Sequence, residues 1–567
     1  MPTRIFQLCD EHVQRECALD PVMATFRGVA GDFGPGTDYG PDGHAARAAN
    51  ARDTLRRLAV LTPTGDADRL AAAHLRERLE AGLAAYDLGE PLRQVRAPFG
   101  LLQTLRNSVD LMPRATPEQW RAVADRVAHV PSMLASWRTS LATGAARGLV
   151  AARRQAVEAA AQAQRYADGA SFQRVLDDYR ASGDSGASGD SGAGGDGDLR
   201  DELARAVAAA HAAYAETAAW LRDTYAPGAA GSDGVGPERY AVYSRLSLGD
   251  TIDPVEAYEW GWDELRRLEA EMAVEADRIK PGAGVDEAIA HLDATDYLEG
   301  IDAYRDWLRE RHDQAIARLH GVHFDIPEPL RTVDVVTVEN SSAGSAYYTP
   351  PSEDLSRPGR TWWPAAARER FGVWAELTTV FHEGVPGHHL QLGQLRVQGG
   401  KLSRFSRLSG VSGHSEGWAL YAERLADELG WHTTPGSRLG MLKGSALRAA
   451  RVVIDIGVHL DLPVPDREAE RHGPRWSFET AVEVLRDRGR IAAHRLHPEV
   501  VRYCGWPAQA TAYKLGERAW LAARDEARAR SGADFDLKRW HTDALSLGPV
   551  GLGALAEVLR AAGPDRR

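Results

Sequence analysis

Residues 368–389 read RERFGVWAELTTVFHEGVPGHH, a stretch that combines a helix signal with an interruption of that helix. Side chains on one helix face recur at spacings of three and four residues, namely Phe371, Trp374, Thr378 and Phe381. This spacing predicts a helix over Arg368–Glu383. Just beyond it, Pro386 cannot donate a backbone hydrogen bond and would clash with the carbonyl group of His382. The helix must therefore kink or bulge after Glu383.

Histidines lie on both sides of this interruption. His382 and His388 are six residues apart, whereas the two zinc-binding histidines of an HExxH helix are four apart and project from one face. A two-residue excursion at 384–387 would bring His388 back beside His382. His389 is the alternative ligand, although in a regular helix it lies about 10 Å farther along the axis than His382. Both His388 and His389 therefore remain candidates for the second ligand.

A catalytic zinc ion also needs a third protein ligand and an open position for water. Residues 413–423 read GHSEGWALYAE, and their polar start and apolar face predict a helix with Glu416 in its first turn. Two antiparallel helices would then present His382, His388 and Glu416 together. Glu383 would point to the neighbouring face, where it could take a proton from water at the zinc and pass it to a leaving amine.

The rest of the chain is dominated by helical patterns. Aromatic residues make up only 7% of the 567 residues, and most segments repeat apolar residues at helical spacing, so we expect a mainly α-helical protein. We divide it into an N-terminal helical lobe, 1–240, and a catalytic helical region, 241–567, that together form one structural unit. The Gly/Ser/Asp-rich tract 181–198 has nothing to bury and is expected to be a mobile loop.

Two further elements are expected in the catalytic region. A helix is predicted over Pro254–Ile279, with Asp253 as its N-terminal cap. The segment Arg331–Glu339 is rich in valine and is the best strand candidate of the chain.

Composition excludes several classes of function. The formal net charge of −12 argues against a broad nucleic-acid surface, which would need clustered positive charge. The three cysteines are an odd number without CxxC spacing, so we expect neither a disulfide framework nor a thiolate zinc site. No stretch of about 18 uninterrupted apolar residues occurs, and the first residues lack the apolar core of a signal peptide. We expect a cytoplasmic protein that binds neither nucleic acid nor membrane.

The chain resembles the bacterial family called domain of unknown function 885. The motifs that carry this resemblance are HEGVPGHH from His382, EGWALYAE from Glu416 and AYYTPP from Ala346 to Pro351. Weaker likeness appears at 451–459 and 506–516. The resemblance covers roughly Tyr240–Val550, and the N-terminal third matches only loosely.

That family is itself similar to gluzincin-type zinc peptidases such as thimet oligopeptidase, neurolysin and carboxypeptidase Taq. The similarity implies a large two-lobed helical fold, with a deep channel between the lobes and a small β-sheet beside it. It also implies one Zn²⁺ per chain, bound by His382, His388 and Glu416, with Glu383 as general base.

The resemblance also suggests where a substrate would bind. In such peptidases a short edge strand near the zinc helix pairs with the extended substrate, and the segment 331–348 is suitably placed. Tyr347 and Tyr348 at its end would either stack on the substrate or pack their loop on the core.

An additional hydrogen-bond donor should face the oxyanion that forms during hydrolysis. Tyr513 is the first candidate, followed by Tyr503 and His459, and each of them could equally be a buried structural residue. Asp455 lies four residues before His459 and could pair with it. The remaining candidate substrate contacts are His459, Gln509 and Lys514.

The function expected from these observations is hydrolysis of peptide bonds in short or unfolded peptides by a zinc-dependent metallopeptidase. Three alternatives remain: a zinc hydrolase of a non-peptide amide or ester, a non-enzymatic peptide-binding helical protein, and a non-haem iron site, which also uses two histidines and one carboxylate. Because Glu383 follows the first histidine directly, hydrolysis is favoured over iron chemistry. No sequence pattern indicates the peptide length, the choice between internal and terminal cleavage, or the oligomeric state.

Overall fold

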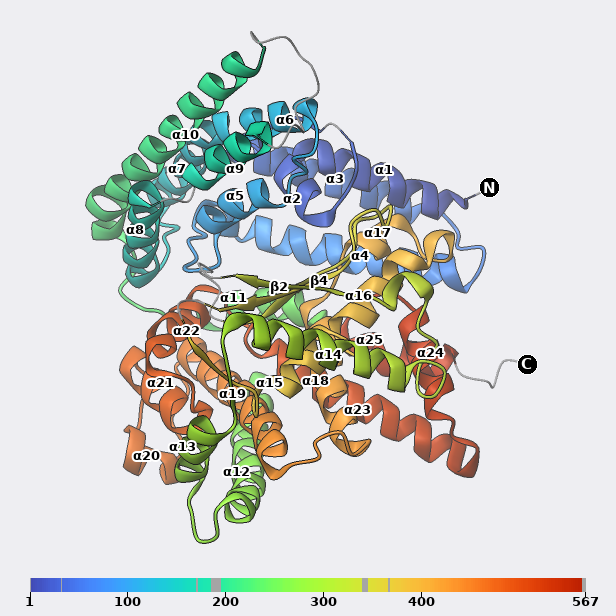
Figure 1. The fold of residues 1–567 in the computed structure, drawn as a ribbon. Helices are drawn as coiled ribbons and strands as arrows, with labels where there is room; N and C mark the ends of the chain where they lie inside the picture. Colours follow the sequence, from blue (N-terminus) through green and yellow to red (C-terminus); the bar gives the residue numbers. More distant parts are fainter. Residues whose placement is uncertain are drawn as a thin grey trace.

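Helices make up most of the computed structural model, and the expectation of a mainly α-helical protein is confirmed (Figure 1). The structure describes residues 2–31, 33–169, 172–184, 195–338, 345–365 and 368–562. Within these residues the strands form only two small sheets, one of two strands and one of three.

The N-terminal helices occupy the upper part of Figure 1, in blue to teal. They are α1 (Arg4–Leu19), α2 (Pro21–Arg27), α3 (Pro41–Ala59), α4 (Asp66–Asp87), α5 (Leu101–Asp110), α6 (Pro117–Ala128), α7 (Val130–Ala146), α8 (Arg153–Asp168), α9 (Gln173–Asp184) and α10 (Gly195–Trp220). One apolar core is formed entirely by residues between Val22 and Ala229. A second core joins α1 and α4 to Phe405 and Leu408 of the C-terminal part. The predicted boundary near residue 240 stays a prediction.

The C-terminal part surrounds a core in which α12 and α19 pack together. Its helices are α11 (Gly236–Leu248), α12 (Pro254–Ile279), α13 (Val285–Thr295), α14 (Ile301–Leu319), α15 (Glu376–Glu383), α16 (His388–Val397), α17 (Arg404–Leu408), α18 (Ser412–Glu428), α19 (Pro435–Leu460), α20 (Asp466–His472), α21 (Phe478–Val484), α22 (Ala493–Gly505), α23 (Ala512–Ser531), α24 (Leu537–Ser546) and α25 (Leu552–Ala562). The helix predicted over Pro254–Ile279 is confirmed, and the Asp253 carboxylate caps it by accepting from two backbone N–H groups.

A three-stranded sheet lies between the two groups of helices (Figure 1). Its order is β2 (Asp334–Val338), β4 (Arg360–Pro364) and β3 (Tyr347–Thr349); β2 runs parallel to β4, and β3 runs antiparallel to it. The strand predicted within Arg331–Glu339 is therefore confirmed as β2. Both β2 and β3 are edge strands of this sheet.

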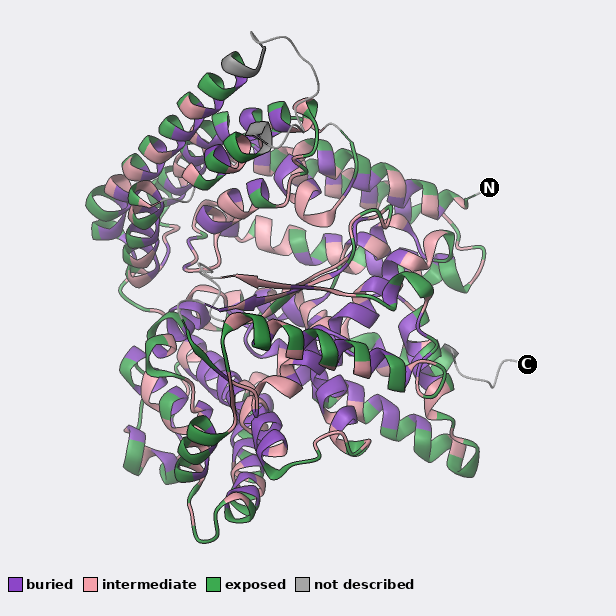
Figure 2. Ribbon diagram, viewed as in Figure 1, coloured by how far each residue is buried: buried purple, intermediate pink, exposed green. Residues whose placement is uncertain are grey.

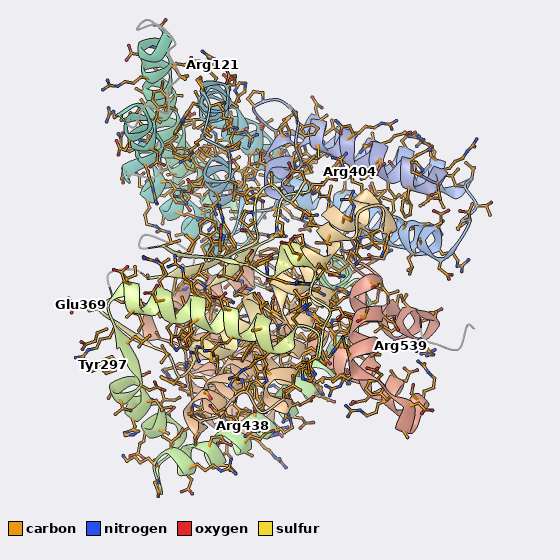
Figure 3. All side chains as sticks on the ribbon, turned by 45° about the vertical axis from the view of Figure 1, so that its right-hand side comes forward. Arg121, Tyr297, Glu369, Arg404, Arg438 and Arg539 are labelled. Atoms are coloured by element: carbon orange, nitrogen blue, oxygen red, sulfur yellow. The ribbon has the colours of Figure 1, made fainter. Side chains whose placement is uncertain are left out.

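The prediction of a helix over Arg368–Glu383 is correct only for its second half. Residues 370–372 form strand β5, which pairs antiparallel with β1 (Tyr297–Glu299), and the helix begins at Glu376. The two segments meet where Figure 3 labels Tyr297 and Glu369. Pairing with a strand distant in sequence, together with stacking of Phe371 on Tyr304 at 4.4 Å between ring centroids, overrides the local helical pattern.

Both ends of the segment 181–198, predicted as a loop, are helical. Helix α9 continues to Asp184 and α10 begins at Gly195. Extending an existing helix by one residue adds one hydrogen bond at little further cost, so adjoining helices can run into a polar tract. Residues 185–194 lie outside the described part of the chain.

Helices α18 and α23 cross with their backbones in direct contact. A Cβ atom on Gly417 would lie 2.4 Å from the carbonyl carbon of Gly516, and one on Gly516 would lie 2.2 Å from the carbonyl oxygen of Gly413. Only glycine permits this approach. The crossing sets the position of the N-terminal part of α18, which carries Glu416 just after the first turn.

Replacing Gly417 by alanine should therefore destabilise the protein. The added methyl group must push α23 away from α18, which we expect to cost about 1–3 kcal/mol, as overpacking of a core does. The apparent melting temperature, measured by scanning calorimetry, should fall. Gly82→Ala is the matched control, because Gly82 is exposed in α4 and a Cβ there meets nothing within 4 Å. Equal melting temperatures of the two variants would contradict the close crossing.

Candidate metal centre

The predicted interruption of the histidine-bearing helix is confirmed. Helix α15 ends at Glu383, α16 begins at His388, and residues 384–387 form a turn between them. The imidazole rings of His382 and His388 lie 4.8 Å apart, centroid to centroid, and are nearly perpendicular at 85°. The break thus brings together two histidines that an unbroken helix would hold apart.

Backbone contacts hold the turn in place. The N–H group of Gly387 donates to the carbonyl oxygen of Phe381 at 3.0 Å, and the indole N–H group of Trp418 donates to the carbonyl oxygen of Pro386 at 2.8 Å. A Cβ atom on Gly387 would lie 2.1 Å from the carbonyl oxygen of His382. Glycine is therefore required for the chain to fold back this tightly.

Helix α18 places Glu416 against both imidazoles. Oε2 of Glu416 lies 3.4 Å from Nε2 of His382 and 3.4 Å from Nε2 of His388. One ligand atom from each of the three residues lies within 4.8 Å of the ligand atoms of the other two. No other three His, Cys, Asp or Glu side chains come this close together in the described residues. Two ligands about 2.1 Å from a tetrahedral zinc ion are themselves about 3.4 Å apart. The spacing therefore fits one zinc ion.

The electrostatics of the three groups also fit a cation. Oε2 of Glu416 is buried without a hydrogen-bond partner, although it faces two imidazoles. Burial alone would raise the pKa of this carboxyl group, but the neighbouring imidazoles of His382 and His388 hold the pKa well below its usual range. The carboxylate is therefore ionised and points at the place where a metal would bind.

The alternative ligand, His389, is occupied by other contacts. Its Nδ1 atom lies 3.0 Å from the hydroxyl group of Tyr348, and its Nε2 atom lies 3.1 Å from the carbonyl oxygen of Leu330. Burial lowers the pKa of this imidazole to about 4, so it is neutral. With both ring nitrogens engaged, His389 joins α16 to strand β3 and leaves His388 to face His382.

A second glutamate on α18 orients His382. Glu423 Oε1 lies 2.8 Å from Nδ1 of His382, and Oε2 accepts a hydrogen bond from the hydroxyl group of Thr378. Arg448 on α19 lies 3.5 Å from the same carboxylate. Burial opposes protonation of His382, but the neighbouring carboxylate of Glu416 and the hydrogen bond to Glu423 raise the pKa of the imidazole to about 9. Glu423 thus holds Nδ1 of His382 and leaves Nε2 directed to the site.

Glu383 lies within the same buried group of charges. Its side chain is 5% exposed. Burial raises the pKa of this carboxyl group, while the two imidazoles of His382 and His388 counteract part of that effect. A buried carboxylate next to a metal-ligand set is the arrangement of a general base.

Tyr513 and Tyr348 are the two aromatic residues closest to the histidines. The ring of Tyr513 stacks on His382 with 6.5 Å between centroids, and its hydroxyl oxygen lies 3.4 Å from Nη2 of Arg502. The ring of Tyr348 lies 6.5 Å from that of His388. Both residues suggested by the sequence therefore border the candidate metal centre.

The ring of Tyr347 packs on the neighbouring strand. It stacks on Trp362 of strand β4 with 5.7 Å between ring centroids and keeps 39% of its surface exposed. It lies on the edge strand β3, where it remains accessible to a peptide.

The other predicted contact residues are buried in polar networks. The hydroxyl group of Tyr503 donates to Glu499 at 2.7 Å, and Nε2 of His459 lies 3.0 Å from the carbonyl oxygen of Tyr503. Asp455 is 3.8 Å from His459, but it also accepts from the backbone N–H group of Ala508 at 2.8 Å. These contacts place both His459 and Tyr503 in the packing between α19 and α22.

Gln509 and Lys514 also have protein partners. Gln509 accepts a hydrogen bond from Arg502 at 2.6 Å. The ammonium group of Lys514 lies 2.8 Å from Glu264, donates to Ser445 at 3.0 Å and is paired with Glu517. The positive charge of Lys514 is thus balanced by two carboxylates.

Comparison with known proteins agrees with this architecture. The model of a family described as "Bacterial protein of unknown function (DUF885)" matches residues 21–559. The chain belongs to the DUF885 family. The match extends through the N-terminal helices, farther than the sequence motifs alone suggested. No curated protein matches the chain.

Two solved structures share the DUF885 fold seen here. A lipoprotein candidate from Colwellia psychrerythraea is 21% identical, with 98% of each chain covered and a TM-score of 0.83. A lipoprotein candidate of unknown function from Shewanella oneidensis is 17% identical, with a TM-score of 0.73 over 98% of this chain and all of the other. In the described residues no helix is long and apolar enough to cross a bilayer. The cytoplasmic location stays a prediction.

Three residues of the site were not identified from the sequence: Glu423, Thr378 and Arg448. For Glu423 a signal was present, because it lies seven residues after Glu416 in a predicted helix and therefore on the same face. Thr378 was noted only for its helix face. Arg448 comes from α19, whose packing beside α18 has no local signature.

We predict that Glu423→Gln weakens zinc binding by roughly 10- to 100-fold, as the loss of a carboxylate behind a ligating histidine generally does. The measurement is competition between the metal-free protein and a chelator of known affinity. Glu428→Gln is the matched control, because this glutamate lies on the same helix but pairs with Arg524 at 2.7 Å. Unchanged affinity of Glu423→Gln would mean that His382 is not a ligand held by this carboxylate.

Proposed function

We propose that the protein is a zinc-dependent metallopeptidase that hydrolyses peptide bonds in short or unfolded peptides. The main support is the spacing of His382, His388 and Glu416, which suits a single tetrahedral ion, next to the buried carboxylate of Glu383. Three protein ligands leave the fourth position of such an ion open, as catalytic zinc sites require.

The side chains of the site have separate roles in the proposed hydrolysis. When bound by His382, His388 and Glu416, zinc supplies Lewis acidity and lowers the pKa of water. Glu383 accepts a proton from the attacking water molecule and donates it to the nitrogen of the leaving amine. Burial raises the pKa of Glu383 above its usual range, which makes the carboxylate a better proton acceptor.

Tyr513 is placed to stabilise the negative charge that develops on the attacked carbonyl oxygen. Its ring is held against His382, and its hydroxyl group lies beside the guanidinium group of Arg502. A cation next to the phenol strengthens the hydrogen bond that the phenol donates to an oxyanion. Tyr513 and Arg502 thus stabilise the charge on the carbonyl oxygen, whereas Glu383 transfers the proton.

Strand β3 offers a way to bind the peptide backbone. It is an edge strand, and its Tyr348 borders His388 while Tyr347 remains accessible. An extended peptide that pairs with such an edge binds through its main chain, so its sequence matters little. This mode suits a peptidase that acts on many short or unfolded peptides.

Glu383→Gln should retain zinc but lose activity by about 10²- to 10⁴-fold, because it removes the general base without removing a ligand. His382→Ala should lose both the zinc and the activity. The measurements are zinc content by plasma mass spectrometry after dialysis, and cleavage of a peptide library followed by mass spectrometry. Glu369→Gln, a substitution of an exposed glutamate on the same segment, is the control and should behave like the wild type.

Other outcomes would select a different function. Iron in place of zinc would indicate a redox site with the same ligands. Zinc without peptide cleavage would point to a non-peptide amide or ester. Peptide binding that is unaffected by Glu383→Gln, with no turnover by the wild type, would indicate a binding protein.

A further inference from the structure

Three arginines gather around one glutamate beside the candidate metal centre. Arg495, Glu499 and Arg502 follow one another at spacings of four and three residues on α22, so they share one face of that helix. Arg451 reaches the same glutamate from α19. We call Arg451, Arg495 and Arg502 the arginine cluster.

The positive charge of this cluster is not balanced. Glu499 lies 3.2 Å from Arg451, 3.4 Å from Arg502 and 4.0 Å from Arg495, and no other carboxylate of the described residues lies within ion-pair distance of these three. Their further hydrogen bonds go to neutral acceptors, which are Ser345, Tyr503, Gln509 and Tyr513. Within ion-pair distance, the three guanidinium groups thus share one carboxylate, that of Glu499.

This excess charge lies inside the protein. Arg451 keeps 5% of its surface exposed and Arg502 keeps 9%. Arg495 is partly exposed, but its Nε atom is buried without a hydrogen-bond partner. Buried cations are costly unless an anion pairs with them. The cluster therefore has more positive charge than the single carboxylate of Glu499 can balance.

Tyr513 connects the arginine cluster to the metal centre. One neighbour of its ring is His382, at 6.5 Å, and another is the guanidinium carbon of Arg451, at 4.9 Å from the ring centroid. Its hydroxyl group lies 3.4 Å from Arg502. The unbalanced positive charge therefore lies one aromatic ring away from the candidate metal ligands.

We propose that the arginine cluster binds the C-terminal carboxylate of the peptide, so that the protein releases short C-terminal pieces and does not cut within long chains. This inference rests on the proposed peptidase function. A carboxylate matches the planar fork of a guanidinium group. One extended residue spans about 3.3–3.6 Å, and one aromatic ring separates the arginine cluster from His382, so we expect a released piece of one or two residues.

The predicted reaction is an ordinary hydrolysis. The hydroxyl group of water joins the carbonyl carbon, the C–N bond breaks, and a proton goes to the amine nitrogen. The carboxylate held by the arginine cluster is unchanged and leaves with the amino acid or dipeptide. Lys514, which the sequence suggested as a substrate contact, does not suit this role because Glu264 and Glu517 already pair with it.

The test uses two libraries of N-acetylated hexapeptides that are identical except for their C-termini, one with free acids and the other with amides. The zinc-loaded wild type should cleave the free acids at least 100-fold faster and release one or two residues. Arg502→Gln and Arg495→Gln should each reduce this ratio about 10-fold or more. Arg524→Gln is the control, since Arg524 is equally buried but is balanced by Glu428.

Binding is measured separately so that a failure of catalysis does not hide the result. Both libraries are offered together to immobilised, zinc-loaded Glu383→Gln, and the retained peptides are identified by mass spectrometry. Among the retained peptides, free acids should be enriched at least 10-fold over amides. A second substitution in the Glu383→Gln protein, either Arg502→Gln or Arg495→Gln, should abolish this enrichment. The Arg524→Gln control should keep it.

The two proposals fail in different ways. Equal cleavage of acids and amides, or products cut at internal positions, would overturn the carboxylate site and leave the peptidase function intact. No cleavage by a zinc-loaded wild type would overturn the peptidase function. Equal retention of acids and amides on immobilised Glu383→Gln would overturn the carboxylate site, whether or not cleavage is seen. Loss of the acid preference in Arg524→Gln would show that the effect is not specific to the arginine cluster.

Discussion

The candidate site depends on bringing two imidazoles and a carboxylate to within a few ångström of one another inside a protein. A regular helix cannot do this with histidines six residues apart, so α15 stops at Glu383 and the chain folds back through 384–387 before α16 begins. The third group arrives on α18, whose position is set by its glycine contact with α23. Glycine makes both close approaches possible, because a Cβ atom would collide with backbone in each case.

Charge balance explains much of the surrounding packing. The helices that bear His382, His388 and Glu416 are largely buried (Figure 2). Polar groups in such a place are tolerated only when they are paired. Glu423 is accordingly held by Thr378, His382 and Arg448. Glu416 Oε2 lacks such a hydrogen-bond partner, which is why its environment favours a cation.

The two sides of the site differ in electrostatic character. On one side, Glu383, Glu416 and Glu423 surround the histidines with negative charge. On the other, the arginine cluster has more positive charge than Glu499 can balance. Tyr513 lies between the two. This polarity would orient a peptide, because a substrate has one negatively charged end and a neutral bond to be broken.

The sequence by itself determined the helical class, the interruption at Pro386, helix α12 with its Asp253 cap and strand β2. All of these follow from local spacing or local backbone chemistry. The tertiary structure decided that residues 370–372 are a strand, that His389 binds Tyr348 and Leu330, and that Lys514 is neutralised while the arginine cluster is not. Those outcomes depend on partners far away in sequence, and a local pattern does not encode which distant carboxylate or strand will meet a given side chain.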